Sequence, residues 1–339
     1  MSVRPFGRAG DQEVVEVTLA ADGIEAKIIT WGAVLRDLSV PGRAARQRAV
    51  LGWNRLEDYV ASPANFGAVV GRYANRIGQA RFRLGGREFI LVPNENGHAL
   101  HGGPAGFGRR VWSLVSHDTR RAHLALVSEA GDMGYPGRLH VFATYEIAAP
   151  AILRLSLQAF ADEPTPVNLT SHTYFNLDGS PDARDHRLEL AADFFLRTDA
   201  ELIPTGEVAS VAGTPFDFRR ERPIRHPGPA FDLDALLVIR RERAAEAFLA
   251  KAARLSSPVS GVAMDLWTTE IGLQVYDGNQ ISDVASGLDH QPYRRNAGIA
   301  LETQRFPNAP NHAHFPACTL RTGEVSRQVT EWRFSLAGP

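Results

Sequence analysis

Glu302 is the carboxylate in this sequence whose surroundings best suit acid–base chemistry. It directly follows the apolar residues 298–301 and precedes Thr303 and Gln304. A carboxylate at the end of a buried strand loses solvation, which raises its pKa and suits it to act as a general base. A glutamate on an edge strand, paired with an arginine, fits the same position, so the sequence leaves both roles open. Asp232 is the second candidate carboxylate, and Asp234 lies beside it.

Two of the eleven histidines lie in unusual segments. His101 lies in ENGHALHGGPAGFGRRVW (95–112), where the glycines that follow it predict a turn or a close approach of the backbone. His172 lies in VNLTSHTYFNL (167–177), which is dense in hydrogen-bonding and aromatic side chains. A catalytic role suits each histidine, but a capped turn or a core hydrogen bond explains each equally well. Arg76, in GRYANRIG (71–78), either bridges carbonyl oxygens or projects into a cleft.

Several well-known catalytic motifs are absent from the sequence. It contains no GxSxG, no GxxxxGK[ST] and no HExxH, and no GxGxxG follows a predicted strand. Serine hydrolysis, phosphoanhydride chemistry and hydride transfer therefore have no support from motifs. His312 and His314 have the spacing to share one side of an extended segment, but no further metal ligand lies near them in sequence. The combination that remains is a histidine acid with a carboxylate base.

The composition limits the class of partner. The 339 residues include 37 Lys+Arg and 38 Asp+Glu, so the net charge of −1 predicts binding neither to nucleic acid nor to an anionic membrane. The single cysteine, Cys318, cannot form an intramolecular disulfide. The first residues lack the apolar core of a secretory signal, and no apolar run is long enough to span a membrane. We therefore expect a cytoplasmic protein without a membrane partner.

Short segments with alternating apolar residues run along the whole chain and predict antiparallel strands. Asp22-Gly23 and Gly85-Gly86 each separate two such segments and predict two-residue hairpins. The predicted strands are 15–20, 24–30, 80–84, 87–91, 123–127, 139–147, 151–160, 187–198, 262–267, 272–276 and 298–303. Residues 240–255 have the composition of a helix, and residues 213–229 suggest a long surface loop. No shift in composition divides the chain, so we expect a single domain over residues 1–339.

Six segments, in order, resemble signatures of the aldose 1-epimerase (galactose mutarotase) family. They are GRYANRI (71–77), HALHGGPAGFGRRVW (98–112), DMGYPGRL (132–139), VNLTSHTYFNL (167–177), TTEIGLQVYDGN (268–279) and ALETQRFPNAPN (300–311). The resemblance implies an all-β fold, a large single-domain antiparallel β-supersandwich with a cleft on one broad face. In place of the predicted helix at 240–255, it implies a strand and hairpin.

The resemblance also implies an activity and the residues that carry it. Such enzymes interconvert the α and β anomers of a free hexose or pentose without a cofactor or metal, by opening and closing the sugar ring. Glu302 takes the place of the base and His172 that of the acid, and we expect a nearby carboxylate to favour protonated His172. The implied substrate-binding residues are Asn75, Arg76, His101, Tyr174, Asp232 and Gln274. Asp234 remains an alternative to Asp232, because the family's usual histidine and aromatic residue do not follow either one.

Other functions stay open at this stage. The arginines within 219–225 could bind a phosphate group, so a hexose-6-phosphate 1-epimerase is an alternative function. Asp232 and Glu302 as a carboxylate pair would suit a glycoside hydrolase or lyase. The same fold without activity would be a sugar-binding module, and His101, His172 and Glu302 together would suit a metal site. We expect a monosaccharide as the partner and either a monomer or a homodimer.

Overall fold

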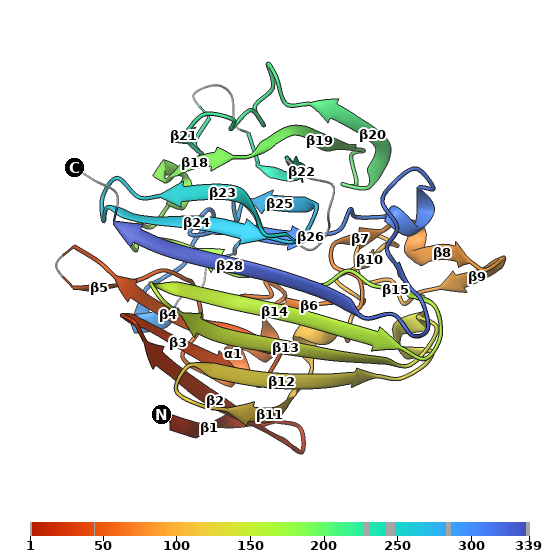
Figure 1. The fold of residues 1–339 in the computed structure, drawn as a ribbon, viewed down its shortest axis with the longest axis horizontal. Coiled ribbons are helices and arrows are strands. Elements are labelled where there is room, and N and C mark those ends of the chain that lie inside the picture. The colour runs from red at the N-terminus through yellow and green to blue at the C-terminus, as the bar shows by residue number, and fades with distance from the viewer. Residues whose placement is uncertain (1, 44, 227–230, 242–247, 283–285, 337–339) are drawn as a thin grey trace.

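The computed structural model describes residues 2–43, 45–226, 231–241, 248–282 and 286–336 (Figure 1). In this part of the chain, nearly all regular structure is strand, and the strand ladders pair antiparallel. The predicted antiparallel all-β class is confirmed. Strands form three larger sheets and several two-stranded ribbons among the described residues. Within these ranges, no helix is both long and apolar enough to cross a membrane.

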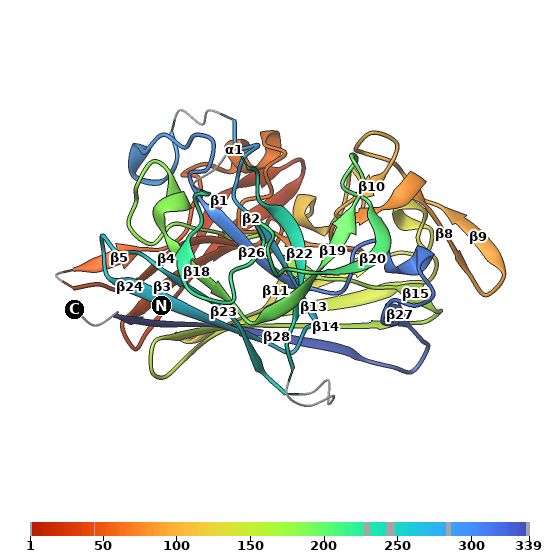
Figure 2. The same cartoon turned by 90° about the horizontal axis from the view of Figure 1, so that it is seen from above.

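The largest sheet has nine strands in the described structure. In spatial order they are β11 (Ser113–His117), β12 (Arg121–Ser128), β13 (Leu139–Ala148), β14 (Ile152–Ala161), β28 (Ser326–Leu336), β24 (Val262–Thr268), β23 (Ala250–Ser256), β18 (Arg187–Leu190) and β21 (Arg222–Pro223). Figure 2 shows its long strands along one side of the molecule. The strand nearest the C-terminus, β28, pairs with β14 on one side and with β24 on the other, so it joins the two halves of this sheet.

Strict alternation in β13 explains which face of the nine-stranded sheet is buried. Every second residue of this strand, from Leu139 to Ile147, is buried, and the residues between them are half-exposed. Successive side chains of a strand point to opposite faces, so one face packs on the core and the other meets solvent. The buried face joins the main hydrophobic cluster, which also includes Leu35, Leu237 and Trp332 from the other sheets and from β28.

The other two large sheets complete the fold. The five-stranded sheet contains, in order, β1 (Ser2–Ala9), β2 (Gln12–Ala21), β3 (Ile24–Ile29), β4 (Val34–Pro41) and β5 (Arg46–Arg48). The six-stranded sheet contains, in order, β17 (Tyr174–Phe175), β26 (Ile299–Gln304), β25 (Gly272–Tyr276), β22 (Asp234–Ile239), β19 (Ala192–Thr198) and β20 (Pro204–Ser210). Both share the main core cluster with the nine-stranded sheet.

Short elements connect these sheets and carry several polar loops. The ribbons are β6 (Val69–Val70) with β16 (Thr170–Ser171), β7 (Arg76–Ile77) with β10 (Ala99–Leu100), β8 (Arg81–Leu84) with β9 (Arg87–Ile90), and β15 (Thr165–Pro166) with β27 (Thr319–Leu320). One α-helix, α1 (Leu56–Ala61), lies among the described residues, and the sequence patterns did not predict it.

Both predicted hairpins are confirmed. The turn at Asp22-Gly23 joins β2 to β3, and the turn at Gly85-Gly86 joins β8 to β9. The predicted strand over 187–198 is two strands, because β18 and β19 pair with different neighbours in different sheets.

The helix suggested for 240–255 is wrong where the structure describes it. Residues 250–256 form β23, which lies between β18 and β24, and residues 242–247 lie outside the described residues. Pairing with two neighbouring strands satisfies the backbone of this segment and overrides its helical composition. The described part of 213–229 is mostly turns with the short strand β21, which fits the predicted loop.

Candidate active site

One face of the six-stranded sheet forms the floor of a pocket of about 520 Å³. Along β26, β25 and β22, the odd-numbered residues, such as Leu301, Val275 and Leu237, belong to the main core. The even-numbered residues therefore point to the opposite face. Glu302 lies directly opposite Gln274, and Asp234 lies opposite Tyr276, so neighbouring strands bring four polar side chains together at the pocket.

In β26 an apolar run precedes a single charged residue, and the alternation of side chains places that charge on the face opposite the core. Ile299 and Leu301 are buried in the core, while Glu302 is 2% exposed on the pocket face. The β26 strand lies between β17 and β25, so Glu302 belongs to an interior strand and not to an edge strand. The edge-strand alternative for Glu302 is therefore wrong.

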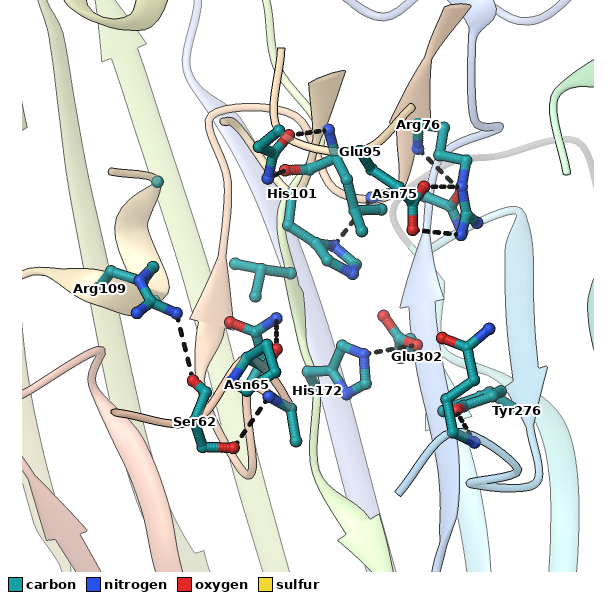
Figure 3. Close-up of a pocket in the computed structure, with 18 of the residues that line it drawn as sticks. Ser62, Asn65, Asn75, Arg76, Glu95, His101, Arg109, His172, Tyr276 and Glu302 are labelled. Atoms are coloured by element: carbon teal, nitrogen blue, oxygen red, sulfur yellow. Dashed lines mark hydrogen bonds and ion pairs between the residues drawn. The ribbon is translucent and has the colours of Figure 1, made fainter. Parts of the chain in front are cut away.

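Two loops place the histidines above this floor. His172 lies between β16 and β17, and its backbone N–H donates to the Ala68 carbonyl while its own carbonyl accepts from Gly67. His101 directly follows β10, which pairs with β7 and so sets His101 beside Asn75. The two imidazole rings pack edge to face with centroids 5.2 Å apart. Figure 3 shows both histidines in the centre of the pocket, with Glu302 and Tyr276 on one side.

His172 and Glu302 form the closest acid–base pair in the described pocket. The imidazole Nε2 lies 3.6 Å from the carboxylate Oε1, and both side chains are buried. This separation exceeds a hydrogen bond between the two groups, and leaves room for substrate oxygens to contact both. Among the described residues, Oε2 of Glu302 and Nδ1 of His172 have no hydrogen-bond partner.

Burial shifts the pKa values of this pair in opposite directions. Desolvation raises the pKa of Glu302 well above its ordinary value, and the nearby charge of Asp234 raises it further, while Arg76 opposes both effects. Desolvation lowers the pKa of His172 to about 4. Our expectation that a nearby carboxylate would favour protonated His172 is therefore wrong, because desolvation disfavours the imidazolium and the raised pKa of Glu302 favours an uncharged carboxyl group.

His101 is held as a neutral hydrogen-bond donor. Its imidazole Nδ1 accepts a hydrogen bond from the backbone N–H of Asn75 at 3.1 Å, and the backbone N–H of His101 donates to the Asn75 carbonyl at 3.1 Å. An Nδ1 that accepts must be unprotonated, so in the neutral ring the proton lies on Nε2. Burial lowers the pKa of His101 well below its ordinary value, which favours this neutral form. His101 therefore presents an N–H at the pocket.

Arg76 lies at the pocket wall in a bidentate ion pair. Its Nε and Nη2 donate to Glu95 at 2.5 and 3.0 Å, and its own backbone N–H donates to the Asn75 side chain. Asn75, Arg76 and Glu95 all line the pocket. Sequence analysis did not identify Glu95, because it contacts Arg76 of strand β7 from a segment 19 residues away and no local pattern marks it.

The structure separates the two candidate aspartates. Asp234 lines the pocket, and its Oδ1 accepts a hydrogen bond from Gln274 Nε2 at 2.6 Å. Asp232 is not among the pocket-lining residues, and its half-exposed side chain pairs with Arg295. Asp234 begins β22 on the pocket face, whereas Asp232 precedes the strand. We therefore replace Asp232 by Asp234 as the candidate sugar-binding aspartate.

The remaining predicted site residues also reach the pocket, and others join them. Tyr174 and Gln274 line it as expected, together with Tyr276, whose hydroxyl accepts from the Gln280 backbone N–H at 2.8 Å. The side of the pocket away from Glu302 has lining residues that sequence analysis missed, among them Ser62, Asn65 and Arg109 (Figure 3). The sequence could have predicted Tyr276, because it lies two residues after Gln274 and therefore on the same face of the strand.

The histidine pair outside the pocket has another role. His312 and His314 contact the carbonyl oxygens of Pro204 and Gly206 at 3.0 and 2.9 Å, and so tie their loop to β20. Across the described residues, no group of three or more His, Cys, Asp and Glu side chains has the arrangement of a metal site.

Comparisons with known proteins agree with this architecture. A family profile described as "Aldose 1-epimerase" matches residues 15–333. The chain is 36% identical to galactose mutarotase from Sus scrofa over 337 residues, which cover 97% of this chain and 96% of that protein. It is also 36% identical to aldose 1-epimerase from Escherichia coli (strain K12) over 324 residues, 92% of each chain.

Solved structures show the same fold. A GalM/aldose epimerase homologue from C. elegans superimposes with a TM-score of 0.90 and 32% identity, covering 95% of this chain and 99% of that one. Galactose 1-epimerase from Lactobacillus acidophilus NCFM gives a TM-score of 0.85 with 27% identity and 99% coverage of both chains. The predicted galactose mutarotase-like supersandwich is thus confirmed.

Proposed function

The chain belongs to the aldose 1-epimerase family, and we propose that it interconverts the α and β anomers of a free aldose with Glu302 as base and His172 as acid. The protein is a carbohydrate epimerase by this membership. The assignment of the two catalytic residues rests on their geometry, and in particular on the 3.6 Å separation of His172 Nε2 and Glu302 Oε1 in a buried pocket.

Ring opening of a cyclic aldose needs one proton removed and one delivered at neighbouring oxygens. The base takes the proton of the C1 hydroxyl, the C1–ring-oxygen bond breaks, and the acid protonates the ring oxygen. Rotation about C1–C2 turns the carbonyl over, and closure with reversed proton transfers gives the other anomer. Both oxygens are attached to C1, so Glu302 and His172 lie close enough together to serve both transfers.

A pair that holds one proton can run the reaction in both directions. Burial favours neutral His172 and protonated Glu302. Hydroxyl groups of a bound sugar can donate to Glu302, and hydrogen bonds to a carboxylate lower its pKa. Substrate binding then shifts the proton towards His172, which gives the base and the acid that ring opening requires. No covalent intermediate is needed.

Polar side chains around the pair suit the hydroxyl groups of a sugar. His101 presents an N–H, Asp234 and Gln274 offer an acceptor and an amide, and Arg76 offers guanidinium N–H groups. Asn75 and Tyr174 complete the binding set that we propose. Pyranose hydroxyls both donate and accept, so a mixture of donors and acceptors can fix the ring in one orientation.

Three further proposals follow the family assignment. The main core cluster, which joins all three large sheets, supports one domain over residues 1–339. The buried, unpaired Cys318 supports a reducing compartment, the cytoplasm. A net charge of −1 supports an uncharged monosaccharide as partner, with neither nucleic acid nor membrane bound, and we expect a monomer or homodimer.

Polarimetry tests this function directly. Freshly dissolved α anomers of glucose, galactose, xylose and arabinose should reach their equilibrium rotation faster with the protein than in buffer alone. Full activity after treatment with a chelator is expected, because none of the proposed steps uses a metal. If none of the four sugars equilibrates faster than in buffer, the proposed function is wrong.

A further inference from the structure

We propose that Glu95 is a specificity-determining residue that makes the pocket select neutral over anionic aldoses by neutralising Arg76. This inference rests on the proposed function, because it concerns which sugars reach Glu302 and His172. The pair is plainly visible at the pocket wall (Figure 3).

The geometry of the Arg76–Glu95 pair determines which guanidinium nitrogen is left for a ligand. Glu95 occupies the edge of Arg76 formed by Nε and Nη2, at 2.5 and 3.0 Å. Nη1 makes no hydrogen bond to any described protein atom, so it remains available for a ligand oxygen. A bidentate contact of this kind restrains the planar guanidinium in one orientation. Glu95 therefore positions Arg76 as well as neutralising it.

Glu95 is itself held in place by its backbone. Its N–H donates to the His98 carbonyl and its carbonyl accepts from the His98 N–H, at 3.2 and 2.7 Å. The carboxylate is 27% exposed and the guanidinium side chain 10% exposed, so solvent screens this pair only in part. Glu95 thus adds a fixed negative charge at the wall of the pocket.

The pocket then disfavours an anionic sugar near Arg76. Three carboxylates line it, those of Glu95, Asp234 and Glu302, against two arginines. One of these, Arg109, lies on the opposite side and donates to the carbonyl oxygens of Ser62 and Val60 (Figure 3). With Glu95 ionised, the Arg76–Glu95 pair has no net charge to attract an anionic sugar, which would also meet the Asp234 carboxylate, whereas burial favours the protonated, uncharged form of Glu302. Neutral hydroxyl groups can still accept from Nη1.

The test compares glucose with glucuronate, a reducing sugar that carries one negative charge. In Glu95→Gln the guanidinium loses its counter-charge, and the ratio of kcat/KM for glucose to kcat/KM for glucuronate should fall by about tenfold or more. This change should shrink at about 0.5 M salt, because mobile ions screen a partly exposed charge. The KM for glucose should rise severalfold, with kcat within about twofold of the parent value, since Arg76 binds the sugar but transfers no proton.

Two further variants separate charge from structure. Glu95→Asp keeps the negative charge on a shorter side chain, so it should keep the discrimination against glucuronate while it raises KM. Glu207, on β20, forms an exposed ion pair with Arg197, on β19, and neither residue lines the pocket. Glu207→Gln therefore removes an equal charge away from the pocket and should leave the ratio unchanged.

The outcomes are distinguishable. If the parent protein does not accelerate mutarotation of glucose, the proposed function fails. If the parent protein is active but Glu95→Gln keeps the parent ratio, or Glu207→Gln changes it equally, the inference about Glu95 is overturned while the proposed function stands. Should Glu95→Gln not fold, an unchanged preference for glucose in Glu95→Asp supports the inference, and a tenfold loss of that preference overturns it.

Discussion

Replacing Asp234 and Asp232 by asparagine, one at a time, tests which of the two binds the sugar. Asp234 contributes one oxygen to a 2.6 Å hydrogen bond from Gln274, and its other oxygen has no hydrogen bond to the described protein. Asp234 lines a pocket large enough for a monosaccharide. Asp234→Asn keeps the size of the side chain but removes the charge that strengthens a hydrogen bond from a sugar hydroxyl.

The expected size of the effect follows from the value of one such bond. A hydrogen bond to a charged group contributes about 1.5–3 kcal/mol, so kcat/KM should fall about 10- to 150-fold in Asp234→Asn. Asp232 is 52% exposed and pairs with Arg295, which is 57% exposed. An exposed ion pair contributes about 0–1 kcal/mol to stability and none to binding a sugar elsewhere, so Asp232→Asn should have nearly the parent activity.

The assay is the initial change in optical rotation of fresh α-D-glucose at concentrations below KM, corrected for the rate in buffer. Circular dichroism should show that both variants fold as the parent does. The reasoning is refuted if Asp234→Asn stays within about threefold of the parent while Asp232→Asn loses tenfold or more. That result would return the sugar-binding role to Asp232.

Three other predictions concern protonation and stability. Because burial raises the pKa of Glu302 above its unfolded value, the folded protein loses stability as pH rises from about 4 through the raised pKa. Glu302→Gln should therefore melt at a higher temperature than the parent at pH 7 but not at low pH, and an equal gain at both would contradict this. The pH profile of kcat/KM should fall on the acid side near the His172 pKa of about 4, where the pair gains a second proton; a profile still flat well below that pH would contradict the assignment. Arg72, 2% exposed, donates to the carbonyl oxygens of Ser128, Pro136 and Gly137. Arg72→Met should lower the free energy of unfolding in urea by at least about 3 kcal/mol, because buried acceptors lose their donors, and a loss below about 1 kcal/mol would contradict this account.

The sequence predicts the site well where one strand carries the information. In β26, apolar residues precede Glu302, and alternation places its side chain on the face opposite the core. The sequence could not decide between Asp232 and Asp234, because the residues that follow Asp234 in its strand are continuously apolar and show no alternation. Register with Gln274 and Tyr276, which only the folded sheet reveals, settles which aspartate faces the pocket.

Properties that depend on contacts between residues far apart in the sequence could not be predicted from it either. Glu95 gains its role from Arg76 of strand β7, and no spacing in the sequence links the two residues. The low pKa of His172 results from burial by surrounding elements, which the sequence around it does not reveal. Residues 250–256 have helical composition but form β23, because strands on both sides offer their hydrogen bonds. Tertiary contacts decide these three features.

The central claim is that Glu302 and His172 transfer the protons, and polarimetry of two variants tests it most directly. Glu302→Gln and His172→Asn should each lower the enzyme-catalysed mutarotation rate of glucose at least about 100-fold, because each removes one positioned proton transfer. Glu207→Gln and His140→Asn, on the surface, should keep the parent rate. A near-normal rate in folded Glu302→Gln or His172→Asn would contradict the acid–base assignment.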